Sequence, residues 1–96
     1  MYFVYIIKSI KTHKFYVGST GDLANRIAHH NAGYNKSTKS GAPWKLVYTE
    51  EFKNRSDAVK RELEIKSKKS KTYIEKMISW ESVPNEIREG HRFEPV

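Results

Sequence analysis

Two apolar segments near the amino end constrain the fold of this 96-residue chain more than any other feature. The first, Tyr2–Ile7, is apolar throughout, as expected of a central strand covered on both faces. The second, Phe15–Ser19, follows after the largely polar stretch 8–14. Strands joined by so short a connection pair as an antiparallel hairpin, so the sequence predicts a sheet built around this pair.

A helix is expected directly after the hairpin, over about residues 23–31. Thr20 or Asp22 can cap its amino end, and Gly33 ends it. Residues 34–43 then mix Ser, Thr, Asn, Gly and Pro without periodicity, which predicts a mobile loop.

One more strand and two more helices follow this loop. Lys45–Phe52 predicts the third strand. The second helix is expected to run to about Lys66, with Asn54 or Ser56 as its cap, and the third covers Lys71–Trp80.

These elements predict a single α/β domain of the α+β type over residues 1–80, followed by a polar tail at 81–96. Its three-stranded, mainly antiparallel sheet would be flanked by about three helices. The chain has no cysteine, which excludes disulfides and thiolate metal sites. It also has no apolar run near the ~18 residues of a membrane span and no signal-peptide pattern, so we expect a cytoplasmic protein without a membrane partner.

The charge of the chain is unevenly distributed. Residues 1–80 carry 16 Lys and Arg against 7 Asp and Glu, a net charge of +9, whereas residues 81–96 carry a net charge of −2. A strongly basic domain favours a nucleic-acid partner. A merely solvated basic surface is the alternative, because charge attracts polyanions without selecting one.

Helical phase separates similar residues in the first helix. Leu23, Ala24, Ile27 and Ala28 would form its buried stripe. Arg26 and His30, four residues apart, would share one flank of that stripe and could face one ligand, with His29 on the opposite, solvent-facing side. The alternatives are an arginine whose stem packs along the core and a partly buried structural histidine.

The second helix places one carboxylate on an apolar face. Ala58, Val59, Leu63 and Ile65 would form its buried stripe, with Glu62 near the centre and Glu64 on the far side. A carboxylate on such a face needs a partner. One possibility is an ion pair with Lys66, one turn later; the other is a divalent cation, since Mg²⁺ typically takes only one or two protein carboxylates.

Together, these residues resemble the GIY-YIG nuclease family, and most closely its small single-domain bacterial members. Phe3-Val4-Tyr5 matches the first motif and Tyr16-Val17-Gly18 the second. The resemblance covers about residues 2–78 and departs from the pattern at Phe3, in place of glycine, and at Ser19, where some members carry a lysine. It implies a catalytic set consisting of Tyr5, Tyr16, Arg26, His30 and Glu62.

The resemblance implies hydrolysis of phosphodiester bonds with Mg²⁺ or Mn²⁺ held by Glu62. We expect Tyr5 to act as the base, Tyr16 to position water or phosphate, His30 to relay the proton and Arg26 to brace the phosphate. The nucleic-acid-binding positions expected around this set are Gly18, Lys36, Lys39, Lys66, Lys68, Lys69 and Lys71.

Two function classes follow. One is an endonuclease of low sequence specificity, acting on DNA more readily than RNA. The other is a weakly catalytic or non-catalytic binding module on the same fold. The carboxylate at Glu62 favours the nuclease, because a purely nucleic-acid-binding surface gains nothing from it. The sequence is compatible with an additional partner protein and with any oligomeric state.

Overall fold

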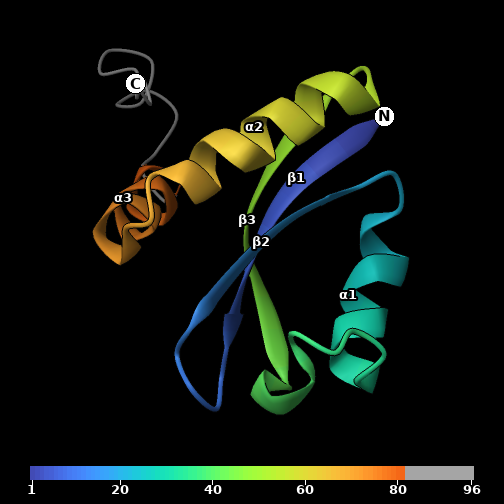
Figure 1. Ribbon diagram of the computed structural model, residues 1–96, viewed down its shortest axis with the longest axis vertical. Coiled ribbons are helices and arrows are strands. Elements are labelled where there is room, and N and C mark those ends of the chain that lie inside the picture. Colours follow the sequence, from blue (N-terminus) through green and yellow to red (C-terminus); the bar gives the residue numbers. More distant parts are fainter. Residues whose placement is uncertain (82–96) are drawn as a thin grey trace.

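A three-stranded antiparallel sheet of order β2–β1–β3 forms the centre of the computed structural model, which describes residues 1–81 (Figure 1). The strands are β1 (Tyr2–Ser9), β2 (Phe15–Thr20) and β3 (Trp44–Phe52). Tyr5 of β1 lies opposite Gly18 of β2 and Thr49 of β3. The predicted α+β fold and its antiparallel hairpin are confirmed.

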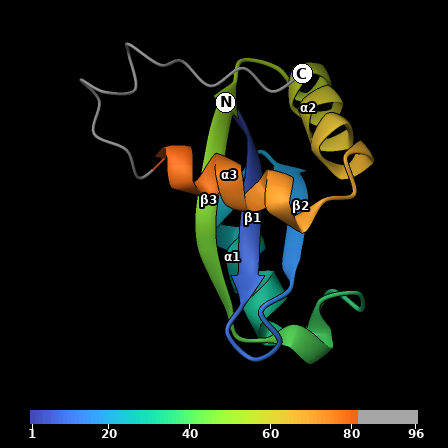
Figure 2. The ribbon, with the colours of Figure 1, turned by 90° about the vertical axis from the view of Figure 1, so that its left-hand side faces the viewer.

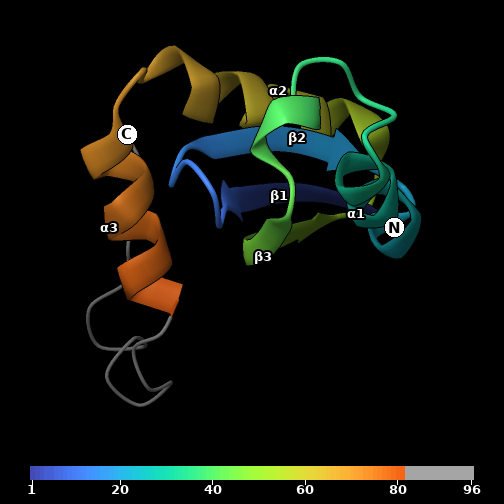
Figure 3. The same ribbon diagram turned by 90° about the horizontal axis from the view of Figure 1, so that it is seen from below.

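Helices cover both faces of the sheet. Helix α1 (Leu23–Ala32) lies behind it and α3 (Lys71–Glu81) crosses in front in the view of Figure 2. Helix α2 (Arg55–Ser67) runs beside β2, as Figure 3 shows from below. Asp22 caps α1, Asn54 caps α2, and Gly33 ends α1 with a φ of 81°.

The alternation of side chains along β1 divides the core into two clusters. Val4 and Ile6 face α2 and α3, where they pack in one cluster with Ala58, Ile65 and Met77. The next cluster consists of Tyr5, Ile7 and Trp44, against which Tyr16, Leu23 and Ile27 pack. The central strand is therefore buried on both faces, as its unbroken apolar sequence predicts.

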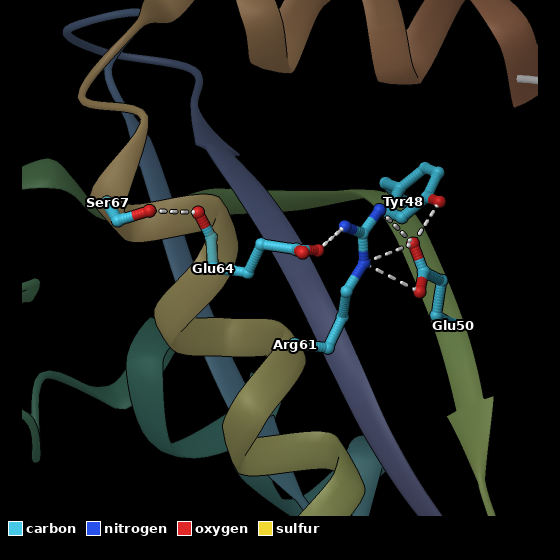
Figure 4. Close-up of polar contacts among 5 residues, drawn as sticks. All are labelled: Tyr48, Glu50, Arg61, Glu64 and Ser67. Carbon is cyan, nitrogen blue, oxygen red and sulfur yellow. Dashed lines mark hydrogen bonds and ion pairs between the residues drawn. The ribbon is translucent and has the colours of Figure 1, made fainter. Parts of the chain in front are cut away.

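A polar network fastens α2 to β3 (Figure 4). Arg61 bonds to both carboxylate oxygens of Glu50, at 2.9–3.1 Å, and also pairs with Glu64, while the Tyr48 hydroxyl donates to Glu50. The Arg61 side chain is only 10% exposed, so these bonds satisfy a guanidinium that would be costly to bury alone.

Two expectations from the sequence are wrong. Ala24 and Ala28 are exposed, because α1 packs on the sheet through Leu23, Ile27 and His30 and is bonded to the Trp44 backbone of β3 by Asn31. Leu63 is 59% exposed, because α2 lies along the edge strand and presents only a narrow face to the sheet.

The segment 34–43 is a connection without a long helix or strand, as its composition predicts, and it packs against the rest of the fold. It contains a 3-10 turn at Lys39–Gly41, and Thr38 is 1% exposed. The Trp44 indole N–H donates to the Thr38 carbonyl at 2.8 Å, which ties the segment to the sheet.

Two further features are the carboxyl-terminal tail and the lack of a membrane-spanning helix among residues 1–81. The predicted tail 81–96 lies outside the described residues, except for Glu81 at the end of α3. Within residues 1–81, no helix has the length and apolar character needed to cross a membrane.

Candidate active site

The centre of the site is a buried chain of three polar side chains. The Tyr5 hydroxyl lies 2.8 Å from His30 Nε2, and His30 Nδ1 lies 2.7 Å from Thr38 Oγ1. None of the three residues is more than 2% exposed. A strand, a helix and a connecting segment thus meet through hydrogen bonds at one buried imidazole.

Hydrogen-bond partners favour one tautomer of His30. Thr38 Oγ1 donates to the Asn35 carbonyl, so it accepts from Nδ1–H of His30. Nε2 is then the acceptor for the Tyr5 hydroxyl proton. In this arrangement, each of the three side chains donates its one proton to one acceptor.

Burial favours the neutral form of both rings. It raises the pKa of Tyr5 well above its usual value, with the neighbouring Tyr16 hydroxyl adding to the effect and Arg26 opposing it. Burial also lowers the pKa of His30, assisted by the positive charge of Arg26. Tyr5 therefore remains a hydrogen-bond donor and His30 a neutral acceptor near pH 7.

Tyr16 lies between this buried chain and the surface. Its ring centroid is 5.0 Å from that of His30 and 6.5 Å from that of Tyr5. Lys66 Nζ lies 5.7 Å from the centre of the Tyr16 ring, within cation–π range. Tyr16 is half-buried, so of the two tyrosines it is the one that can meet solvent or substrate.

Glu62 lies on the side of α2 that faces β2. Its Oε1 accepts from Ser19 Oγ at 2.6 Å, and its Oε2 pairs with Lys66 Nζ at 2.6 Å. The side chain is 17% exposed. Helical phase correctly separates Glu62 from Glu64, but Glu64 is paired with Arg61 rather than free in solvent.

One carboxylate at this place, Glu62, could hold a cation, and at present its two oxygens are bonded to Ser19 and Lys66. Among residues 1–81, no group of three His, Cys, Asp or Glu side chains could hold a metal together. Mg²⁺ does not need such a group, since it usually keeps several waters and binds through one or two carboxylates and substrate phosphates. Glu62 meets that requirement, with Lys66 as its present counter-charge.

Arg26 lies on the exposed side of α1 and borders a different hollow from Tyr16. Arg26 and Ser19 line a polar pocket of about 260 Å³. Tyr16 and Lys66 line a second, larger hollow of about 690 Å³. Three of the five predicted residues thus have their rings in contact, and Glu62 reaches them through Lys66. Arg26 borders a separate pocket, although its charge still acts on Tyr5 and His30.

The predicted binding positions divide into separate groups. Lys66, Lys69 and Lys71 line the larger hollow, whereas the Lys68 ammonium lies over the Tyr73 ring, 5.8 Å from its centre. Lys36 and Lys39 are exposed on the segment after α1.

Gly18 has a packing role. A Cβ there would lie 2.4 Å from the Tyr5 hydroxyl oxygen, so glycine makes room for the buried phenol.

Sequence reasoning missed two residues at the site. Thr38 lies in a segment without periodicity, so no pattern in the sequence indicates that its hydroxyl reaches His30. Ser19 was noted only as a departure from the motif, yet its hydroxyl binds the Glu62 carboxylate across 43 positions of sequence.

Comparison with known proteins places this geometry in a family. A family profile described as the GIY-YIG catalytic domain matches residues 1–77. A UPF0213 protein of Staphylococcus haemolyticus is 46% identical over 67 residues, which are 69% of this chain and 80% of the relative. A UPF0213 protein of Clostridium perfringens is 40% identical over 87 residues, which are 90% of this chain and 91% of the relative.

A solved structure supports the same family assignment. The solution NMR structure of the UPF0213 protein BH0048 from Bacillus halodurans aligns with a TM-score of 0.54 and 33% identity, covering 90% of this chain and 92% of that one. The chain therefore belongs to the GIY-YIG family, whose members are generally nucleases, and within it to the UPF0213 proteins.

Proposed function

We propose that the protein is a divalent-metal-dependent endonuclease that hydrolyses phosphodiester bonds in DNA, in preference to RNA, with low sequence specificity. The observation that carries this proposal is the contact of Tyr16 with His30 on one side and with Lys66, the partner of Glu62, on the other. A half-buried phenol, a cation and a carboxylate at one point suit hydrolysis of a phosphate ester. The proposal includes a cytoplasmic location.

The two tyrosines take different roles in this proposal. Tyr5 is the base expected from the sequence, but the burial of Tyr5 and its bond to His30 favour the protonated phenol. We therefore assign proton acceptance from the attacking water to Tyr16, the half-buried tyrosine, which contacts His30 and Lys66. Tyr5 and His30 act as positioning residues that hold the Tyr16 ring from behind.

The charged residues complete the assignment. The Arg26 guanidinium suits the non-bridging oxygens of a phosphate, because its planar fork matches two of them. Glu62 would hold Mg²⁺ or Mn²⁺, which when bound supplies charge neutralisation at the leaving 3′ oxygen. With Glu62 bound to the metal, Lys66 could pair with a second anion, the phosphate of the substrate.

A second candidate function is a nucleic-acid-binding module with little or no catalysis. The observation that favours it is the Glu62–Lys66 ion pair, because this pair already compensates the partly buried carboxylate without a metal.

The Glu62→Gln variant separates the two functions. It removes the charge that a metal requires and nearly keeps the shape, so we expect loss of cleavage of at least about 100-fold with unchanged folding and DNA binding. Glu64→Gln is the matched control on the same helix, since Arg61 retains Glu50 as a partner. Cleavage is followed on DNA and RNA with Mg²⁺, with Mn²⁺ and with EDTA. A wild-type protein that binds DNA but cleaves nothing with either metal would establish the binding module instead.

A further inference from the structure

A small polar pocket lies beside the candidate active site and shares only Arg26 with the predicted catalytic set. It has a volume of about 260 Å³ and is lined by Tyr2, Ser19, Thr20, Gly21, Arg26, Arg55 and Ala58. Figure 1 shows why these residues meet: the start of α1 and the start of α2 lie at the same end of the molecule. None of Tyr5, Tyr16, His30 and Glu62 lines it.

Two arginines from different helices face this pocket without an acidic partner. The ion pairs among residues 1–81 use Arg61 and Lys66 as cations, and none of them includes Arg26 or Arg55. The Asp22 carboxylate accepts from the Asn25 amide as the cap of α1. The hydroxyls of Ser19 and Thr20 already donate to Glu62 and to the Asp22 carbonyl, so the two guanidiniums are the main donors toward the pocket.

The size and chemistry of the pocket fit one phosphate group. Its volume is below the ~300–1,000 Å³ typical of sites for whole small-molecule ligands. The Arg55 guanidinium can bind oxygens of one phosphate in a forked pair, which a lysine cannot do, while Arg26, assigned above to the scissile phosphate, adds positive charge beside it. The first turns of α1 and α2 both border the pocket, and the Asp22 carboxylate that caps α1 offsets part of the positive charge there.

We propose that this pocket binds a phosphate of the nucleic-acid strand that neighbours the scissile one, with Arg55 as its characteristic residue. The inference rests on the proposed function for the identity of the strand. Ser19 connects the two places, because it lines the pocket and its hydroxyl donates to Glu62 at 2.6 Å. A strand that is anchored at Arg55 would thus be positioned relative to the carboxylate.

The first experiment uses inorganic phosphate as the probe and the full chain without divalent metal. Titration is followed by ¹H–¹⁵N NMR, and we expect saturable shifts of the backbone amides of Thr20, Gly21 and Arg55. Arg55→Ala should abolish these shifts. Lys60→Ala is the matched control, because Lys60 is on the same helix but lines a different hollow with Asp57 and Arg61. Shifts that are absent, or that are centred elsewhere, would overturn the proposal.

The second experiment measures DNA affinity, again without metal, at several salt concentrations. Arg55→Ala should weaken binding about 10-fold, as expected for loss of a charge-assisted hydrogen-bonded contact, and should lower the salt slope by about 1. Lys60→Ala should change the DNA affinity and the salt slope much less. Equal effects of the two variants would mean that Arg55 contributes only to the overall field, and the pocket assignment would fail.

These two experiments test the phosphate pocket separately from the proposed nuclease activity, because neither experiment requires the protein to cleave DNA. If the protein cuts no substrate but Arg55→Ala still shows the selective loss, the phosphate pocket stands and the nuclease assignment falls. If cleavage is established and Arg55→Ala binds like Lys60→Ala, only the pocket is lost.

Discussion

At the scale of single residues, burial decides which groups carry protons. Tyr5 and His30 lie within 2.8 Å of each other, and both lie almost entirely out of contact with water. Because charged forms are disfavoured in such surroundings, the phenol keeps its proton and the imidazole remains neutral. A motif search gives both tyrosines the same weight, whereas their exposure separates the buried Tyr5 from the half-buried Tyr16.

Thr38 offers a direct test of this buried chain. Thr38→Val keeps the shape but removes the acceptor of the His30 Nδ1 proton, so we expect a loss of stability of about 1–3 kcal/mol. The proton should also move toward Nε2, which changes the ring ¹⁵N shifts of His30 in NMR spectra. Thr38→Ser retains Oγ1 and should restore the wild-type spectrum. A valine variant with unchanged ring shifts would contradict the proposed tautomer.

The lowered pKa of His30 predicts how stability depends on pH. Below its ordinary pKa of 6.5, the unfolded chain binds a proton at His30 that the folded protein excludes. The unfolded state then holds more protons, so the free energy of unfolding rises with pH and falls as the pH drops below about 6.5. Thermal unfolding between pH 5 and 8 should show a flatter slope for His30→Gln, and the exposed-residue control His29→Asn should retain the wild-type slope.

At the scale of elements, α2 shows how one helix serves several purposes. Successive residues turn by about 100°, so Arg61 reaches β3, Glu62 faces β2 and Lys60 faces solvent. Helical phase predicts the direction of Glu62 for this reason. It failed for Leu63, because phase gives the direction of a side chain but not whether another element covers it.

Gly18 tests the fit between the two motif strands. Its backbone lies opposite Tyr5, and an added methyl group would lie 2.4 Å from the Tyr5 hydroxyl oxygen and 2.6 Å from the ring. The ring is buried and cannot move aside freely, so Gly18→Ala should cost about 1–3 kcal/mol and disturb the bond to His30. Gly21→Ala is the comparison, since its nearest neighbour is the partly exposed Tyr2 ring at 3.2 Å. Equal melting temperatures of the two variants would argue against a tight fit.

At the scale of the whole molecule, the distribution of charge governs binding. Residues 1–80 carry a net charge of +9, and the two hollows beside β2 are bordered by basic side chains. A protein of this kind binds polyanions mainly by releasing counterions from phosphates. We expect weak binding with little preference for sequence.

Salt titration measures this contribution. If about four phosphates are neutralised, affinity for DNA should fall about 100-fold between 50 and 200 mM salt. Fluorescence anisotropy with labelled DNA can follow the change, and a duplex of scrambled sequence should give the same slope. Affinity that stays constant over this range would rule out the electrostatic mode of binding.

The sequence by itself determined the elements, their order and the family of the protein. Alternation along β1, the caps Asp22 and Asn54 and the stop at Gly33 are local signals, since they depend on residues only a few positions apart. For the same reason helical phase could direct Glu62 toward β2. These features can be predicted from the sequence without knowing which residues lie across a tertiary contact.

Only the tertiary structure decided which polar groups meet. The hydroxyls of Thr38 and Ser19 reach His30 and Glu62 across 8 and 43 positions, and Arg26 shares a pocket with Arg55 from another helix. Such meetings depend on how the helices pack over the sheet, because the energy of a buried hydrogen bond or a charge depends on its surroundings in space. The protonation of Tyr5 and the greater accessibility of Tyr16 follow from packing alone.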